Sequence, residues 1–293
     1  MIETRLLQYF LAVAEEQNIT RAANYLHITQ PTLSKQMMDL EGQLGKKLFI
    51  RGKKKISLTE DGLYLRGRAQ EIISLIDKTE SDFRENEQNI SGDVHIGCGE
   101  YKNSSAIIEI ISDILDFYPD IHFHFFSSNA DAIIERLDKG LLDAGILLEP
   151  EITPRYDYQK LPLKETWGIL MQKNSPLASK EKIILEDLSG NPVIIPSQTS
   201  NNQRFKQLFA DHNVSLDIVA TYNLIFNASL MVQAGIGPAL CIGGLVTETS
   251  ENNLVFRPFE PTITSNVFLF TKKYQVFSKA TKLFISRLLR ELK

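Results

Sequence analysis

The first sixty residues contain three blocks in which apolar side chains recur every three or four positions. In the first block, Leu6, Phe10 and Val13 share one helical face. This spacing is typical of a helix that packs one face on a core. The pattern predicts three short helices, over residues 4–17, 20–26 and 30–44.

A proline marks the beginning of the third helix. Pro31 follows Gln30, in the first turn of a helix, where the missing amide hydrogen would have no intrahelical partner. Thr29 can cap this helix with its hydroxyl. Gly45 tolerates the left-handed conformation in which many helices end. We therefore expect the helix to begin at Gln30, after a tight corner, and to end just before Gly45.

A basic hairpin is predicted after the third helix. Residues 47–59, KLFIRGKKKISLT, are typical of two short strands around a Gly-Lys turn. Residues 46–55 hold six basic side chains and no acidic one. Three helices and a basic hairpin form the layout of a winged helix-turn-helix, whose third helix enters the major groove of DNA. The alternative is an ordinary helical hairpin with a solvated lysine face, but the conjunction of these features favours DNA binding.

Residues 63–88 predict one long helix. Apolar positions alternate there at spacings of four and three, which is the period of a coiled-coil seam. The seam consists of Leu65, Ala69, Ile72, Ile76, Thr79 and Phe83. We expect this seam to pair two copies of the chain; the alternative is a helix that packs on its own domain.

The remaining two hundred residues alternate between strand and helix patterns. The β-α-β-α-β order predicts a mainly parallel sheet with helices on both faces. The first such unit has strands at 93–99, 121–128 and 143–148, and helices at 104–117 and 130–140. The second has strands at 168–172, 192–196 and 217–222, and helices at 202–212 and 228–234. The chain then returns through a strand at 266–271 to a terminal helix. We predict two lobes joined by two crossings with a cleft between them, the first over 91–162 and 266–293 and the second over 163–265.

Composition and charge separate two regions of this chain. Its 293 residues are 43% hydrophobic and 23% charged, as in a globular protein. The net charge of −4 arises within residues 91–293, which hold 19 basic and 23 acidic side chains, because residues 1–90 hold 13 of each. Phosphate binding is therefore expected of the N-terminal region. Two cysteines, no membrane-length apolar run and no signal-peptide layout predict a cytoplasmic protein.

The N-terminal region also resembles a known family. The segment ITRAANYLHITQPTLSKQMMDLEGQLGKKLFIR, followed by ISLTEDG, is similar to the signature of the LysR-type transcriptional regulators. The resemblance continues more weakly through YPDI, LDAGIL, NPVIIP and MVQAGIGPAL. It implies an α/β protein in three parts: a winged helix-turn-helix over 1–58, a linker and dimerisation helix over 59–89, and an effector domain over 91–293, two-lobed like the periplasmic binding proteins.

The resemblance implies a sequence-specific regulator of transcription. Its implied partners are double-stranded DNA, a small-molecule effector and further copies of itself, as a dimer or tetramer, with RNA polymerase as an additional partner; no membrane and no other cofactor is implied. In that family the residues matching Gln30, Pro31, Ser34 and Lys35 lie at the DNA, supported by the one matching Arg51. Together with neighbouring polar and basic positions, the candidate DNA-binding residues are Arg21, Thr29, Gln30, Pro31, Thr32, Ser34, Lys35, Arg51 and Lys53.

Candidate effector-binding residues follow from the predicted sheets. Ligands of open α/β sheets lie beyond the carboxyl ends of the strands, where a serine or threonine at a helix start can hold an anion or can be only a cap. Because they cluster, we favour a ligand site. The candidates are Gly99, Glu100, Tyr101, Ser104, Leu148, Ser197, Thr199, Ser200 and Asn223. Glu100 argues against a simple dicarboxylate effector.

Other chemistry has weaker support. His122 and His124 could bind zinc from one face of a strand, but exposed histidines are the better interpretation, and no metal site is expected. Cys98 could be a redox-sensing thiol, although a buried apolar role is commoner. The sequence contains no nucleophile elbow, P-loop or glycine-rich dinucleotide motif, so an enzyme is not expected. The remaining alternative is a small-molecule receptor or transferase on the same two-lobed fold, with the N-terminal helices as an interaction module.

Overall fold

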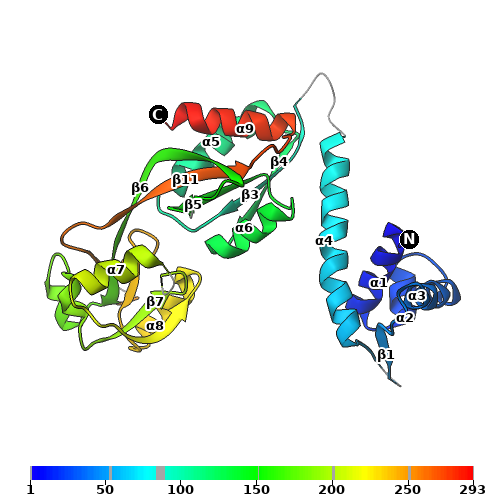
Figure 1. Cartoon of the computed structure of the whole chain (residues 1–293), viewed down its shortest axis with the longest axis horizontal. Coiled ribbons are helices and arrows are strands. Elements are labelled where there is room, and N and C mark those ends of the chain that lie inside the picture. The colour runs from blue at the N-terminus through cyan, green and yellow to red at the C-terminus, as the bar shows by residue number, and fades with distance from the viewer. Residues whose placement is uncertain are drawn as a thin grey trace. The chain divides into compact units, whose positions relative to one another are not determined.

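The computed structural model describes residues 2–52, 55–83, 90–150, 152–199, 202–249 and 252–292. It consists of two compact units, Met1–Arg84 and Glu85–Lys293, and Figure 1 shows the helices and strands of each. In these described ranges, no helix combines the length and the apolar character needed to span a membrane.

Three helices and a hairpin build the first unit. Helices α1 (Thr4–Glu16), α2 (Ile19–Tyr25) and α3 (Gln30–Leu44) enclose a core, and β1 (Phe49–Arg51) pairs antiparallel with β2 (Ile56–Leu58). Phe10, Leu33 and Leu40 are completely buried in this core. The predicted winged helix-turn-helix is confirmed, with α2 one residue earlier than predicted.

The boundaries of α3 follow the residues that predicted them. The Thr29 hydroxyl accepts a hydrogen bond from the Thr32 amide, and Pro31 lies in the first turn. Gly45 ends the helix with a φ of 64°. Because each of these features is local, the corner between α2 and α3 could be predicted from a few neighbouring residues.

Helix α4 (Glu60–Phe83) follows the hairpin, and its first half packs on the core of the first unit. Ala69 is completely buried and Leu65 packs against the same core. This part of the predicted dimer seam is therefore wrong, because these two side chains are covered by the chain's own α1. Further along, Ile72 and Leu75 are exposed. The side chain of Phe83 lies outside the described part of the chain.

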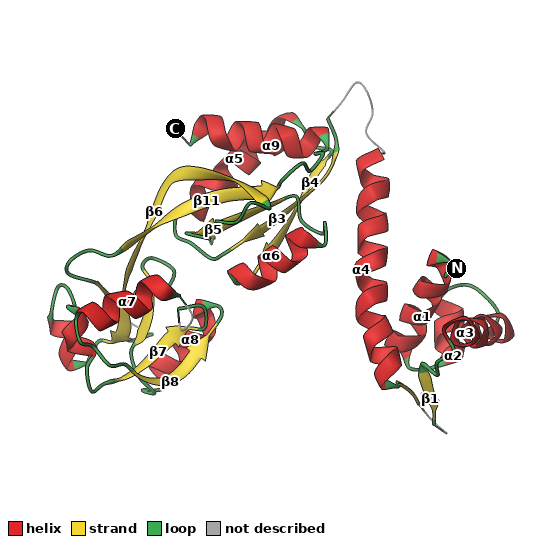
Figure 2. Cartoon of the chain, in the orientation of Figure 1, coloured by secondary structure: helices red, strands yellow, loops and turns green. Residues whose placement is uncertain are grey.

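The second unit begins with a parallel sheet. Its strands β3 (Gly92–Cys98), β4 (Ile121–Ser127) and β5 (Ala144–Leu148) lie in the order β4-β3-β5, connected by α5 (Ser104–Phe117) and α6 (Ala130–Asp138). Helices α5 and α9 (Lys279–Glu291) cover one face and α6 covers the other (Figure 2). The predicted first lobe is confirmed.

The second lobe repeats this arrangement. Its strands β7 (Pro192–Pro196), β8 (Asp217–Tyr222) and β9 (Ala239–Ile242) lie in the order β9-β7-β8, also parallel. The connecting helices are α7 (Gln203–Asp211) and α8 (Ile225–Gln233). Helix α8 begins three residues before its predicted start, because Ile225 belongs to the buried face that packs on the sheet.

Two long strands join the lobes. Strand β6 (Tyr156–Gln172) pairs with β11 (Thr264–Lys272) along its first part and with β9 and β10 (Leu254–Pro258) along its last part. Two short 3-10 helices, Pro176–Ser179 and Leu185–Leu188, follow it. The sequence pattern predicted only the last five residues of β6 and did not predict β10. The pairing of β6 changes at Trp167, four residues beyond the predicted lobe boundary.

Candidate functional site

One edge of α3 presents polar side chains to solvent. Gln30, Pro31, Thr32 and Lys35 are exposed and Ser34 is half-buried. Their apolar neighbours on the opposite face belong to the core. The N-terminal end of α3 therefore offers short polar groups and one cation to a partner surface, as the sequence predicted.

The other predicted DNA-binding residues differ in what surrounds them. Thr29 is engaged as the cap of α3. Arg21 is exposed, and its Nε lies 3.4 Å from a carboxylate oxygen of Glu16. Arg51 pairs through its backbone with Ile56 in the hairpin. The side chain of Arg51 and the whole of Lys53 lie outside the described residues.

Glu41 on α3 joins this helix to the start of the wing. Its carboxylate accepts hydrogen bonds from the Leu48 amide at 2.8 Å, the Phe49 amide at 3.3 Å and Lys47 Nζ at 3.1 Å. Burial by itself would raise the pKa of Glu41, but these hydrogen bonds together outweigh it and lower the pKa. Sequence reasoning missed this residue, although an acid four positions after Met37, on the core-facing side of the helix, is a usable signal.

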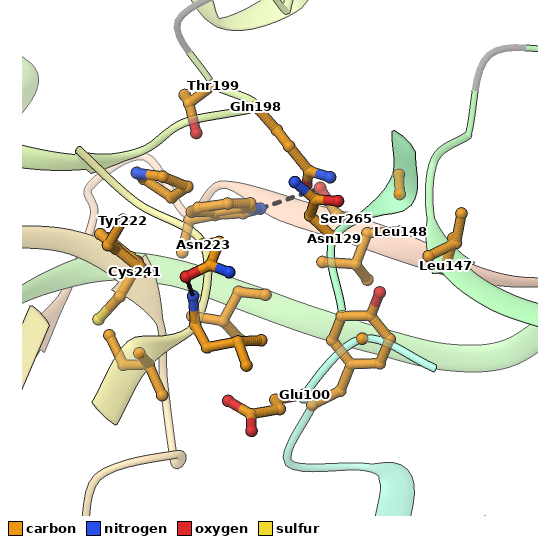
Figure 3. A pocket seen from close by; sticks show the side chains of 18 of the residues that line it. Glu100, Asn129, Leu147, Leu148, Gln198, Thr199, Tyr222, Asn223, Cys241 and Ser265 are labelled. Carbon is orange, nitrogen blue, oxygen red and sulfur yellow. Dashed lines mark hydrogen bonds between the residues drawn. The ribbon is translucent and has the colours of Figure 1, made fainter. Parts of the chain in front are cut away.

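The second unit contains a cavity of about 130 Å³ in the cleft between its lobes (Figure 3). Its lining comes from the residues at and after the carboxyl ends of six strands: β3, β4 and β5 in the first lobe, and β7, β8 and β9 in the second. Ligands of open α/β sheets bind at these ends. The sequence folds in this way because each parallel strand delivers its following loop to the same side of the sheet.

Six of the predicted effector-binding residues line this cavity. They are Gly99, Glu100, Tyr101, Leu148, Thr199 and Asn223. The Ser197 amide instead donates to the Tyr222 carbonyl oxygen at 2.8 Å, and Ser197 does not line the cavity. Ser200 lies outside the described residues.

Ser104 lines a second cavity next to the first, rather than the cleft cavity. The N-terminus of its helix already has an internal acceptor, because the Asn103 amide donates to Glu165 Oε1 at 3.0 Å. Glu165 is only 2% exposed, and this burial raises the pKa of its carboxyl group. The expected shared contact of one ligand with Ser104 and Thr199 is therefore corrected: a carboxylate from β6 occupies the place at α5 that an anion would take.

Several lining residues were not predicted. Trp167 Nε1 donates to Ser265 Oγ at 2.9 Å, and the Trp167 ring meets that of Phe205 edge-on at 4.8 Å between centroids. Gln198 Nε2 is buried and has no hydrogen-bond partner in the described part of the chain. Gln198 stands within the predicted 197–200 segment, where reasoning from hydroxyl groups passed over its amide.

The two residues suspected of redox or metal chemistry have other surroundings. Cys98 is 4% exposed, and burial raises the pKa of its thiol to about 12. It is therefore protonated at neutral pH and weakly nucleophilic. His124 Nε2 lies 2.8 Å from Asp93 Oδ1, and its ring stacks on that of His95. Across the described ranges, no three potential metal ligands form a group.

Two protein families match this chain. Residues 4–63 match the model described as bacterial regulatory helix-turn-helix protein, lysR family, and residues 87–293 match the LysR substrate binding domain. One relative is the Hca operon transcriptional activator HcaR of Escherichia coli K12, 28% identical over 97% of this chain and 96% of its own. Another is the uncharacterized HTH-type transcriptional regulator YnfL of the same organism, 31% identical over 66% of this chain and 65% of its own.

A solved structure has a similar fold over the whole chain. Full-length CbnR complexed with its target DNA superposes with a TM-score of 0.79 at 19% identity, covering 99% of this chain and 100% of that one. The fold of both units is thus that of a known DNA-bound protein.

Proposed function

Because the chain belongs to the LysR family of DNA-binding, effector-controlled transcriptional regulators, we propose which of its residues carry out the two parts of that function. The polar edge of α3 contacts the operator, and the cleft cavity of the second unit binds the effector. The cavity carries this proposal, because its lining comes from six strand ends in both lobes. The alternative of a receptor or transferase is not favoured, since residues 4–63 match a regulatory DNA-binding family.

Two kinds of DNA contact are assigned to the first unit. Gln30, Thr32 and Ser34 lie at the N-terminal end of α3, where a recognition helix meets base edges. Lys35 and Arg51 are assigned to phosphate, because cations contribute affinity without reading sequence. CbnR is named for a complex with its target DNA, and we extend double-stranded DNA to this chain as its partner. Bacterial DNA lies in the cytoplasm, which we propose as the site of action.

The effector is proposed to act through the arrangement of the lobes. A ligand in the cavity contacts Thr199 and Asn223 in one lobe and Tyr101 and Leu148 in the other. It must therefore bind one arrangement of the lobes more tightly than another, and it shifts the equilibrium by that difference in affinity. We propose a change of this kind as the signal to DNA-bound subunits.

Operator binding tests the DNA contacts. We would measure fluorescence anisotropy with the promoter region of the protein's own gene and with random DNA, over a range of salt concentrations. Lys35→Ala should weaken both complexes and reduce the salt slope by about one unit. Gln30→Ala should cost about 1–3 kcal/mol on the operator alone. The matched controls are Lys206→Ala and Gln43→Ala, both exposed.

Equal losses of Gln30→Ala on operator and random DNA would place α3 outside the groove. An effect of Lys35→Ala no larger than that of Lys206→Ala would remove the assigned phosphate contact.

A further inference from the structure

The cleft cavity lacks positive charge. Among the described residues, no lysine, arginine or histidine lines it, whereas two carboxylates do, those of Glu100 and Glu149. Glu149 is satisfied by an ion pair with Arg204 and by the amide and side chain of Asn266. Glu100 is exposed and has no hydrogen-bond or ion-pair partner in the described ranges. A ligand in this cavity therefore meets an unpaired carboxylate and no counter-ion for a negative charge.

The helix ends at the cleft do not replace the missing cation. Backbone amides at helix N-termini hold anions where no internal group accepts from them. Here Glu165 accepts from Asn103 at α5, Asn129 Oδ1 accepts from the Ala132 amide at α6, and Asn202 Oδ1 accepts from the Arg204 amide at α7. An anionic ligand would have to displace one of these acceptors.

One buried donor remains open. Gln198 Nε2 is buried without a hydrogen-bond partner among the residues described. Such a group is costly to leave unpaired, so a ligand that offers an acceptor there gains affinity. Figure 3 shows the side chains of Gln198 and Glu100 on opposite sides of the cavity. The two ends of the cavity thus ask for different groups, an acceptor at Gln198 and a donor at Glu100.

The walls and the size limit the body of the ligand. Trp167, Phe205, Tyr222 and Leu148 supply aromatic and aliphatic surface. The volume is about 130 Å³, and apolar cavities of about 150 Å³ accommodate benzene. The cavity therefore fits a molecule of about one ring.

We propose that the effector is an uncharged or cationic molecule of about one ring, with a hydrogen-bond acceptor at Gln198 and an N–H or ammonium group at Glu100. Carboxylates are excluded, because an ionised ligand buried beside Glu100 without a counter-ion loses its hydration uncompensated. This inference rests on the proposed function, in which the cleft is the effector site.

Three probes with the same ring separate the charge classes: benzamide, benzylamine and benzoate. Thermal unfolding of the full chain at neutral pH would be followed with each at equal concentrations up to its solubility limit. A ligand that binds the folded state raises the Tm. We expect benzamide and benzylamine to raise it and benzoate to leave it unchanged.

Two variants connect the binding to the cavity. Glu100→Gln should weaken benzylamine about tenfold, since hydrogen bonds to charged groups contribute most, and leave benzamide nearly unchanged; Glu181→Gln, at another exposed glutamate, is its control. Gln198→Ala should weaken benzamide about fivefold, with Gln43→Ala as its control. Calorimetry gives both dissociation constants.

Each other outcome decides the matter. A Tm increase by benzoate that matches benzamide overturns the inference; if Gln198→Ala also reduces it, the proposed function stands with an acidic effector. Absence of any shift with benzamide and benzylamine overturns the inference as well. Shifts with these two that persist unchanged in both variants overturn the inference and count against the cleft as the effector site.

Discussion

Glu149 and Arg204 form an ion pair that joins the two lobes of the second unit. Glu149 follows β5 in the first lobe and also accepts hydrogen bonds from Asn266, whereas Arg204 lies on α7 in the second and also donates to the Thr264 carbonyl oxygen at 2.9 Å. Both partners are thus anchored at the start of β11, where the chain crosses between the lobes. An effector that changes the lobe arrangement must either keep this pair or break it.

Arg204→Met removes the charge and retains most of the side-chain length. The arginine side chain is 50% exposed, so we expect a loss below about 1 kcal/mol, which corresponds to a Tm decrease of about 2–4 °C or less. Thermal unfolding at low and high salt checks this, with Lys206→Met on the same helix as control. A loss of about 3–5 kcal/mol, as for a buried pair, would contradict the expectation.

Glu41 makes the stability of the wing pH-dependent. Because its folded-state pKa is lowered, its contribution is present above the ordinary glutamate pKa and is lost as pH falls through the folded-state value. Glu41→Gln should cost about 1–3 kcal/mol at neutral pH, and the difference from the parent should shrink under acid conditions. Hydrogen exchange of amides in α3 and β1 measures this, against Asp39→Asn as control. A difference independent of pH would show that the ionised form is not what holds the wing.

Glu165 should show the opposite dependence. Burial raises its pKa in the folded state, so its contribution is present below the unfolded-state pKa and is lost as pH rises through the folded-state value. Glu165→Gln should therefore equal or exceed the parent in stability at neutral pH, with the gain vanishing in acid. Trp167 fluorescence during urea unfolding reports on this unit. A variant that is less stable than the parent only at neutral pH would contradict this sign.

Removal of the Glu165 acceptor gives the matching control. Glu165→Ala leaves the Asn103 amide without the hydrogen bond observed at 3.0 Å. We expect a loss of about 1–3 kcal/mol at neutral pH, distinct from the effect of Glu165→Gln.

Self-association through α4 is expected to depend on Ile72 and Leu75, which are 44% and 43% exposed in the single chain. The double change Ile72→Lys and Leu75→Lys would place charges in an apolar contact, which is costly without partners. Sedimentation velocity should then show a smaller species than the parent. The control is Ile152→Lys, at another exposed apolar position. A double variant that sediments like the parent would place the contact elsewhere.

Local signals in the sequence determined the DNA-binding unit almost completely. Thr29, Pro31 and Gly45 act on their own turns of helix, and the period of Leu33, Met37 and Leu40 specifies which face of α3 is buried. The alternation of strands and helices determined both lobes for the same reason, because one buried face imposes one period. Six of the cavity residues followed, since strand ends converge in any parallel sheet.

Only the tertiary structure decided the features that depend on distant partners. Asn103 and Glu165 are 62 residues apart, and Trp167 and Ser265 are 98 apart. The burial of Leu65 and Ala69 likewise depends on α1 rather than on the pattern along α4. A helix cap or an apolar period is complete within a few residues, so the sequence by itself determines it. Whether a carboxylate closes a helix end, or a glutamine is left unpaired in a cavity, depends on which segments meet in space, and that is a property of the fold.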